Sequence, residues 1–332
     1  MTSNYNDREK FYRALLLLTA LLTMTLILSI LLGAVSFSIS DFTKVLAEPD
    51  SKQAYIIKSI RLPRTLAALF AGMGLAVSGA IIQTVFQNPL ASPNIIGVNA
   101  GASFFVIVCG AFFPASIYLL PISAFCGAFF TAVFIFLLGK KTGFSKTSLV
   151  LAGLAINSLF NSGTDFICNL NDNFIISNKA FRMGSLSNVN QQVLLVASIG
   201  ILFAILAILL FSNELEVMSL GYETATALGL SVTKYRVFFL LLAAILAGCA
   251  ISFAGPISFV GLIIPHIVKL LHIHKTRWYL ILSALMGALL VSICDLLARL
   301  IFRPHEIPVG IILSFIGVPF FLWLLMKRKD RK

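Results

Sequence analysis

Long stretches of this sequence are apolar and uncharged, and the polar interruptions between them are short. From Thr65 to Gly139 the chain contains no Asp, Glu, Lys or Arg. A single membrane span needs about 20 apolar residues, so this segment alone is long enough to cross a bilayer several times. A soluble domain would need charged residues to cover so much apolar chain. The pattern therefore predicts a polytopic membrane protein of the channel or transporter type.

The alternation of apolar runs and polar breaks predicts an all-α membrane protein in which ten helices form one domain over residues 1–332. The expected spans are 12–34, 63–84, 94–112, 117–139, 148–166, 191–212, 235–255, 258–272, 278–300 and 308–326. The third and eighth are short and contain or adjoin Gly and Pro. A cleaved signal peptide is the alternative for the first, but its apolar run from Ala14 to Leu32 exceeds the usual length and further spans follow. We interpret it as a retained span.

Composition supports this class and narrows the partners. The chain has 332 residues, of which 59% are hydrophobic and 11% charged, whereas soluble domains carry about 25% charged residues. The net charge of +12 could suit nucleic acid, but the basic residues lie between apolar runs and form no stripe with aromatic residues. We therefore expect a lipid bilayer and no nucleic acid as partner. The five cysteines are widely spaced without Cys-x-x-Cys, which indicates neither a disulfide nor a metal site.

The distribution of basic residues predicts the orientation. Lys and Arg accumulate on cytoplasmic loops, and both chain ends are basic, in tails expected at residues 1–11 and 327–332. Both termini are therefore expected in the cytoplasm, which agrees with an even number of spans. The loops that fall inside under a ten-span arrangement are also basic, with Lys140, Lys141, Lys146, Lys234, Arg236, Lys269, Lys275 and Arg277.

One loop contradicts this rule. Segment 40–64 falls outside, yet it carries five basic residues, and two more lie at the outer edge of the ninth span. These residues are Lys44, Lys52, Lys58, Arg61, Arg64, Arg299 and Arg303. An acidic partner that docks on the outer face would explain the charge. The alternative is that the flank of the first span already fixes the topology, so that later charges are tolerated.

Small residues in the second span indicate close helix packing. Gly72, Ala76 and Ala80 recur at helical spacing, and such a ridge lets backbones approach closely in lipid. A glycine-rich helix that faces lipid is the alternative. The segment from Ala71 to Gly79 also resembles the one from Ala247 to Gly255 in an oppositely directed span, a short echo of the inverted repeats found in transporters.

Groups that could carry chemistry inside the membrane are few. The chain lacks Gly-x-x-x-x-Gly-Lys-Ser/Thr, so it has no phosphate-binding loop of its own. Asp295 is the clearest acid within a span, and Arg299 follows four residues later, where an i,i+4 ion pair is favoured over an independent functional role. Asp165 lies near the outer end of the fifth span and is expected to face water. His272 and His274 are interpreted as a solvated helix end, with a metal site as the alternative.

The loop between the sixth and seventh spans is amphipathic and falls on the cytoplasmic side. Glu214 and Glu216 lead into it, and Gly221 and Gly229 are placed where they could end short helices. Two short surface helices of this kind could transmit force from a soluble partner. An ordinary connector is the alternative.

Several motifs occur in one order and at characteristic spacing over residues 55–326. They are Arg61-Leu-Pro-Arg64, Ser78-Gly79-Ala80, Gln83, Asn88-Pro89-Leu90-Ala91-x-Pro93, Gly97-Val98-x-x-Gly101-Ala102, Met183-Gly184-Ser185, Ala227-Leu228-Gly229, Gly255-Pro256-Ile257-x-Phe259-Val260-Gly261-Leu262-x-x-Pro265-His266, Asp295-x-x-Ala298-Arg299, Glu306-Ile307-Pro308-Val309-Gly310 and Gly317-x-Pro319-Phe320-Phe321. This arrangement resembles the iron-siderophore and cobalamin permease family of ABC importers.

The resemblance implies a cobalamin-importer-like permease fold of ten spans in the bacterial cytoplasmic membrane. It implies a dimer with an identical or related permease, a pathway along the dimer interface, two cytoplasmic ABC ATPase subunits and an extracytoplasmic substrate-binding protein. It implies no catalysis by this chain, because a separate subunit hydrolyses ATP, and no cofactor or resident metal is expected.

The resemblance also assigns roles to residues. Arg61, Arg64 and Arg299 match arginines that meet glutamates of the binding protein. The cytoplasmic gate matches Asn88 and Leu90, and more loosely Lys146 and Thr147. Asn157, Ser158 and Asn161 are expected to line the path. The loop that rests on the ATPase corresponds to Ser219, Leu220, Gly221, Ala225, Ala227, Leu228, Gly229 and Leu230.

Two other classes are considered. An ion-coupled secondary carrier would need more buried acids at mid-membrane, and an intramembrane enzyme would need a paired acid or metal cluster. Neither feature is found in the sequence. Ferric siderophore is the expected cargo, with heme and cobalamin as alternatives. Homodimer and heterodimer both remain open.

Overall fold

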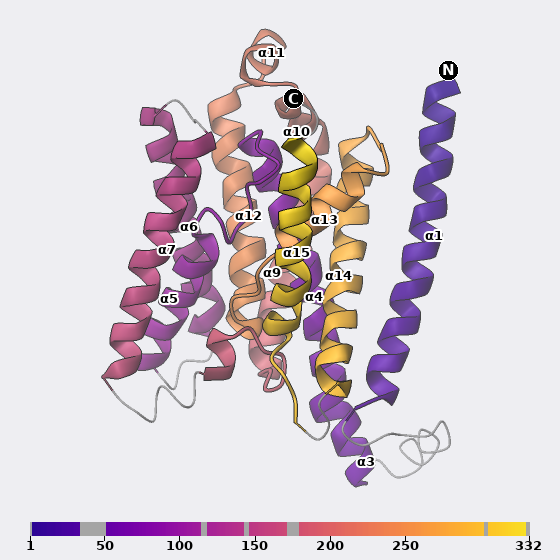
Figure 1. Ribbon diagram of the computed structural model, residues 1–332, viewed down its shortest axis with the longest axis vertical. Coiled ribbons are helices and arrows are strands. Elements are labelled where there is room, and N and C mark those ends of the chain that lie inside the picture. The colour runs from indigo at the N-terminus through magenta and orange to yellow at the C-terminus, as the bar shows by residue number, and fades with distance from the viewer. Residues whose placement is uncertain are drawn as a thin grey trace.

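The computed structural model describes residues 2–33, 51–113, 118–142, 146–170, 179–301 and 305–329, and these form helices joined by short turns (Figure 1). The main helices are α1 (Thr2–Leu31), α4 (Leu62–Val85), α5 (Val98–Phe112), α6 (Leu119–Thr142), α7 (Lys146–Asn169), α9 (Gln191–Leu210), α12 (Val232–Ala254), α13 (Val260–Lys269), α14 (Thr276–Leu300) and α15 (Val309–Lys329). Shorter elements are α3 (Lys52–Tyr55), the π-helical turn η1 (Ile56–Arg61), α10 (Ser212–Ser219) and α11 (Tyr222–Ala227).

Each of the ten predicted spans corresponds to one main helix, so the predicted helix order is confirmed. Within the described residues, six segments are long and apolar enough to cross a membrane: Asp7–Leu31, Lys52–Val85, Leu119–Gly139, Gln191–Leu210, Val232–Ala254 and Thr276–Leu300. Helices α5 and α13 are shorter, as the sequence indicated, at 15 and 10 residues. Residue 34 of the first predicted span, Lys44, Arg303 and residues 330–332 of the C-terminal tail lie outside the described residues.

Helix α4 is the centre of the bundle and contacts α12, α13 and α14. Its small residues permit this approach, because a Cβ atom on Gly72 would lie 2.2 Å from the carbonyl oxygen of Gly287, and one on Gly79 would lie 2.0 Å from that of Gly261. A Cβ on Gly287 would in turn lie 2.4 Å from the Cβ of Ala76. The close packing predicted for the small-residue ridge is therefore confirmed.

The two short helices follow interrupted backbone. Residues 86–97 lead into α5, and residues 255–259 connect α12 to α13. Positive φ angles at Gly97 (82°) and Gly255 (70°) suit glycine, whereas Phe259 adopts 68°. The breaks are tied together where Asn99 Nδ2 donates to the carbonyl oxygen of Ile257 at 3.1 Å. Such nonhelical backbone is tolerated at membrane depth because protein groups satisfy it.

Both described chain ends lie at the same end of the bundle as α10 and α11, and α3 lies at the opposite end (Figure 1). We call these the terminal end and the α3 end. This placement agrees with the even number of crossings. Leucine and phenylalanine side chains are exposed along the outside of α1 and α9, for example Leu16 (70%), Leu195 (63%) and Phe203 (65%). Exposed apolar side chains on membrane-spanning helices are the surface expected to face lipid.

Candidate functional site

A buried charge cluster lies at the α3 end, where α4 begins and α14 finishes. Arg64 Nε donates to Asp295 Oδ1 at 2.9 Å, and Arg64 Nη1 donates to Glu306 Oε2 at 2.5 Å. Arg299 Nη2 lies 3.0 Å from the other oxygen of Asp295. The i,i+4 ion pair predicted for Asp295 and Arg299 is therefore confirmed, and Asp295 also joins α14 to α4.

Helix α1 completes this cluster with neutral acceptors. Arg299 Nη1 donates to the backbone oxygen of Ser29 at 3.0 Å, and Nη2 donates to the Ser29 hydroxyl. The guanidinium of Arg61 donates to the backbone oxygens of Ile30 and Leu31 at 2.6 and 2.9 Å. The end of α1 leaves carbonyl groups without helical partners, and these arginines satisfy them.

The three arginines that the resemblance assigns to docking are all buried in the described chain. Their exposed fractions are 5% for Arg61, 5% for Arg64 and 3% for Arg299. A buried charge is costly unless it is paired and hydrogen-bonded. Arg64 and Arg299 are paired with carboxylates, and Arg61 donates to backbone oxygens. Glu306 is more accessible, with a side chain that is 34% exposed, and it covers Arg64. Sequence reasoning noted Glu306 within a motif but assigned it no role, and no signal in the sequence pointed to Ser29.

At the terminal end, the turn after α4 holds two of the residues matched to the gate, Asn88 and Leu90. Asn88 is 2% exposed, and its Oδ1 accepts a hydrogen bond from the backbone N–H of Leu90 at 3.1 Å. This Asx-type turn fixes the position of Leu90, which is half-buried. Lys146 and Thr147 are the first two residues of α7. The structure thus places Asn88 inside the turn rather than on a free surface.

The predicted force-transmitting loop consists of α10, the residues Leu220 and Gly221, α11 and the turn Leu228–Leu230. Helix α11 ends in a Schellman motif, because Leu230 N–H donates to Ala225 O at 3.0 Å and Gly229 N–H donates to Thr226 O at 2.9 Å. Gly221 and Gly229 have φ angles of 113° and 83°, so the prediction that they delimit short helices is confirmed. Ser219 is the last residue of α10, and Ala227 the last of α11.

This loop presents an apolar surface and is tied to two membrane helices. Leu220 and Leu228 are 58% and 63% exposed, whereas Ala225 is buried. Gln87 Nε2, after α4, donates to the carbonyl oxygen of Met218 at 3.2 Å. Glu216 Oε2 accepts from the backbone N–H of Thr276, the first residue of α14, at 3.0 Å. These two hydrogen bonds connect α10 to the turn after α4 and to the first residue of α14.

Helix α7 carries a polar, outward-facing row. Ser158 and Asn161 are exposed, and Ser162 and Asp165 continue the row at helical spacing. Asn157 is half-buried, and its Nδ2 donates to Asn94 O at 2.9 Å. At the α3 end Asp165, whose side chain is 54% exposed, pairs with Arg182, whose side chain is 35% exposed. Exposed amides and a carboxylate are costly against lipid, so this row needs water or protein beside it.

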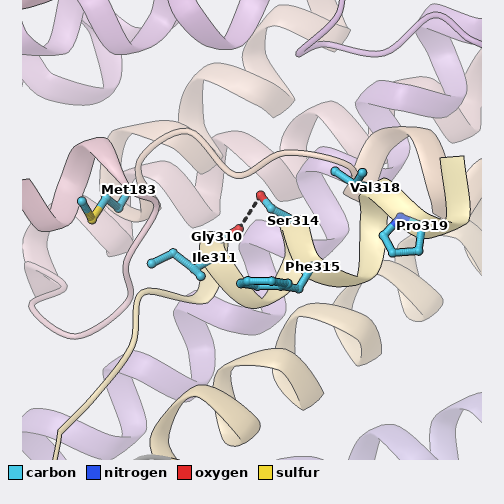
Figure 2. A pocket seen from close by; sticks show the side chains of 7 residues that line it. All are labelled: Met183, Gly310, Ile311, Ser314, Phe315, Val318 and Pro319. Atoms are coloured by element: carbon cyan, nitrogen blue, oxygen red, sulfur yellow. Dashed lines mark hydrogen bonds between the residues drawn. The ribbon is translucent and has the colours of Figure 1, made fainter. Parts of the chain in front are cut away.

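An apolar depression of about 490 Å³ lies along α15. Its lining is Met183, Gly310, Ile311, Ser314, Phe315, Val318 and Pro319, and Figure 2 shows Met183 reaching it from a separate segment. The Ser314 hydroxyl donates to its own helix at Gly310 O, 2.8 Å away (Figure 2). Gly310 N–H donates to Gly184 O at 2.9 Å, which anchors the start of α15 to the Met183-Gly184-Ser185 motif.

The described residues contain no group of three or more His, Cys, Asp or Glu side chains placed to hold a metal ion. His274 is exposed, and its Nε2 lies 3.9 Å from Asp7 Oδ2. His272 adopts a positive φ of 53° in the turn that follows α13.

Comparison with known proteins identifies the relatives of this chain. The sequence model of the FecCD transport family matches residues 21–327. The chain is 41% identical to the Fe(3+)-citrate import system permease protein YfmD of Bacillus subtilis over 92% of each chain. It is 37% identical to the hemin transport system permease protein HmuU of Yersinia pestis, with 84% of this chain and 85% of that protein covered.

A solved structure supports the same relationship. The fold is similar to that of a metal-chelate type ABC transporter in an inward-facing conformation, with a TM-score of 0.81 and 32% identity. That match covers 95% of this chain and 99% of the other.

Proposed function

Because this chain belongs to the FecCD transport family, whose members are membrane-spanning permease subunits of ABC importers rather than enzymes, we propose that it carries a ferric chelate along a path shared with a second permease chain. The predicted ABC permease class is shown by the family. The cargo, the second chain and the other partners are proposals.

The exposed polar row of α7 carries this proposal. Ser158, Asn161 and Asp165 are exposed on a helix of 24 residues in a membrane protein. A second permease packed near this face would enclose water beside the row and would separate the row from lipid. The apolar depression on α15 offers contact area for the same neighbour. Neutral amides and hydroxyls would bind a bulky chelate weakly, which suits transit rather than retention.

We infer two further contacts, and the geometry of the chain supports them. The exposed leucines of the α10–α11 loop would rest on a cytoplasmic ATPase, and the Gln87 and Glu216 hydrogen bonds would pass its movement to α4 and α14. At the α3 end, acidic groups of a binding protein would compete with Glu306 for Arg64. This exchange would serve orientation and association rate more than affinity. Arg61 and Arg299 are buried to about the same degree as Arg64 and donate to the end of α1, so they would support docking by holding α1 in place.

The proposed orientation places both termini in the cytoplasm. The terminal end carries the basic loop residues Lys234, Lys269 and Lys275, and Lys and Arg favour the cytoplasmic side. The membrane would be the bacterial cytoplasmic membrane. The relatives named for Fe(3+)-citrate and hemin support an iron chelate as the cargo. We propose a ferric siderophore, with heme and cobalamin as alternatives.

The test begins with affinity purification of the tagged chain from its native membranes in mild detergent, followed by mass spectrometry. A stoichiometric ATPase with a related permease supports the proposal as a heterodimer, and an ATPase alone supports a homodimer. The purified assembly is then reconstituted in liposomes that contain ATP, so that transport into the liposomes can be measured. Uptake of radiolabelled ferric siderophore, ferric citrate, heme and cobalamin is compared. Uptake that needs an ion gradient and no ATP would instead identify a secondary carrier.

A further inference from the structure

A second groove, unrelated to the proposed pathway, lies between the first turns of α4 and the first turns of α9. Its volume is about 220 Å³. The walls are chiefly apolar, and Lys58 and Gln191 stand at the α3 end. The main lining side chains are Lys58, Leu62, Leu66, Phe70, Gln191 and Leu195. Leu62, Leu66 and Leu195 are 42%, 38% and 63% exposed, so the groove opens to the outside of the bundle.

Lys58 and Arg61 both lie in the π-helical turn η1, yet their side chains have different surroundings. Leu62 N–H donates to Ile57 O, five residues earlier, which widens the helix just before Pro63. Across this turn Arg61 reaches inward to the carbonyl groups of α1, whereas Lys58 is exposed and lines the groove. Gln191 spans the opening, because its Nε2 donates to Ser59 O at 3.5 Å. The local backbone thus assigns the two cations to different surroundings.

Within the described chain Lys58 forms no ion pair with a carboxylate. Lys58 is therefore an exposed part of the basic charge predicted for the outer face, whereas Arg61, Arg64 and Arg299 are buried. A lysine at the edge of a membrane-spanning helix extends its ammonium group toward the headgroup layer. The apolar walls below it lie at the depth of the acyl chains.

We propose that this groove binds one phospholipid with an anionic headgroup, such as phosphatidylglycerol, from the leaflet at the α3 end. The headgroup phosphate pairs with Lys58 and accepts from Gln191, and part of an acyl chain lies against Leu62, Leu66 and Leu195. Charge and shape agree for this occupant, because the cation stands at one end of an apolar slot. A soluble anion would leave the apolar walls unused.

The inner part of the groove is closed to polar recognition. The Ser198 hydroxyl donates to Leu195 O of its own helix at 2.9 Å, so it offers no free donor. The replacement Ser198→Leu would fill this part and break no side-chain hydrogen bond between helices. It provides a variant that removes the acyl site and keeps Lys58.

The experiment uses the complete transporter assembly, stripped of lipid by detergent exchange and titrated with phosphatidylglycerol or phosphatidylcholine of matched chains under native mass spectrometry. We expect phosphatidylglycerol to bind more tightly, and Lys58→Gln to weaken it about fivefold, the effect of one lysine near an anionic surface. Lys52→Gln, which changes an exposed lysine of α3 outside the groove, should leave binding unchanged. Ser198→Leu should weaken both lipids.

Three results would overturn the proposal. The first is phosphatidylglycerol binding that is unchanged in both Lys58→Gln and Ser198→Leu. The second is displacement of bound lipid by millimolar inorganic phosphate, which would identify a soluble-anion site. The third is a Lys58→Gln variant that retains lipid but loses association with the binding protein, which would assign the lysine to protein docking.

Discussion

Arg64 and Asp295 are 231 positions apart in sequence, yet Arg64 Nε donates to Asp295 Oδ1 at 2.9 Å inside the bundle. Their side chains are 6% and 1% exposed. This contact joins α4 to α14, and Arg299 holds the second oxygen of the same carboxylate. Asp295 therefore pairs with two arginines, one at each carboxylate oxygen, at the end of the molecule where docking is proposed.

Asp295→Asn should destabilise the protein strongly. The change leaves Arg64 with Glu306 alone and Arg299 with neutral acceptors, and breaking a buried ion pair typically costs about 3–5 kcal/mol. We expect a large fall in the thermal midpoint of the detergent-solubilised protein, measured by fluorescence-detected size exclusion after heating. Asp165→Asn is the matched control, since its pair with Arg182 is partly exposed and should contribute below about 1 kcal/mol. Equal midpoints for the two variants would contradict the structural role of Asp295.

Glu306→Gln should expose Arg64 to an incoming acidic partner. The variant removes the carboxylate that competes with the binding protein, so we expect faster association, about 2- to 10-fold at low salt, and a steeper decrease with added salt. Surface plasmon resonance with the captured assembly and its binding protein measures both. Glu223→Gln, at the terminal end, should have no effect. Slower or unchanged association would argue that Glu306 is not displaced on docking.

Gly72→Ala should prevent normal assembly of the bundle. A Cβ there would lie 2.2 Å from the backbone oxygen of Gly287, and neither backbone can move without shifting a central helix. Gly110→Ala is the matched control, because nothing lies within 4 Å of its added Cβ. In a helix that change should be neutral or stabilising by up to about 1 kcal/mol. The yield of monodisperse protein after detergent extraction distinguishes the two, and a normal yield for Gly72→Ala would contradict the packing.

Gln87→Asn should weaken the link between the proposed ATPase-facing loop and α4. The shorter side chain cannot reach Met218 O, now 3.2 Å from Nε2, while Asn still tolerates the positive φ of 48° at this position. We expect uptake to fall severalfold while the ATPase remains bound, measured as transport per ATP hydrolysed in liposomes. Gln192→Asn, on the first turn of α9, is the control. Loss of the ATPase from the purified assembly would show that the residue maintains binding rather than coupling.

Hydropathy and local spacing predicted the structural features that depend on residues close together in the sequence. The ten helices, the short α5 and α13 and the Asp295–Arg299 pair follow from apolar run length and i,i+4 geometry. The glycines at the ends of α11 follow from their freedom to adopt positive φ. These features need no knowledge of the tertiary arrangement.

Contacts between distant helices could not be predicted in the same way. The inward direction of Arg61 depends on the π turn η1 and on carbonyl groups of α1, and apolar periodicity carries no signal for either. Arg64 could not be distinguished from a surface arginine because Asp295 and Glu306 approach it only in the folded bundle. The resemblance supplied its proposed docking role, and the structure adds that Arg64 is buried and paired with two carboxylates.

Asn161→Leu tests the proposed path most directly. The change makes an exposed position of α7 more apolar, so membrane insertion and stability should be unaffected or improved. If the row of Ser158, Asn161 and Asp165 faces a water-filled path, a leucine there should lower chelate uptake about tenfold while ATP hydrolysis continues. Leu159→Ile, an exposed apolar position on a neighbouring face of the same helix, is the control and should transport normally. If Asn161→Leu transports like the parent, the polar row lies against protein and the path follows another surface.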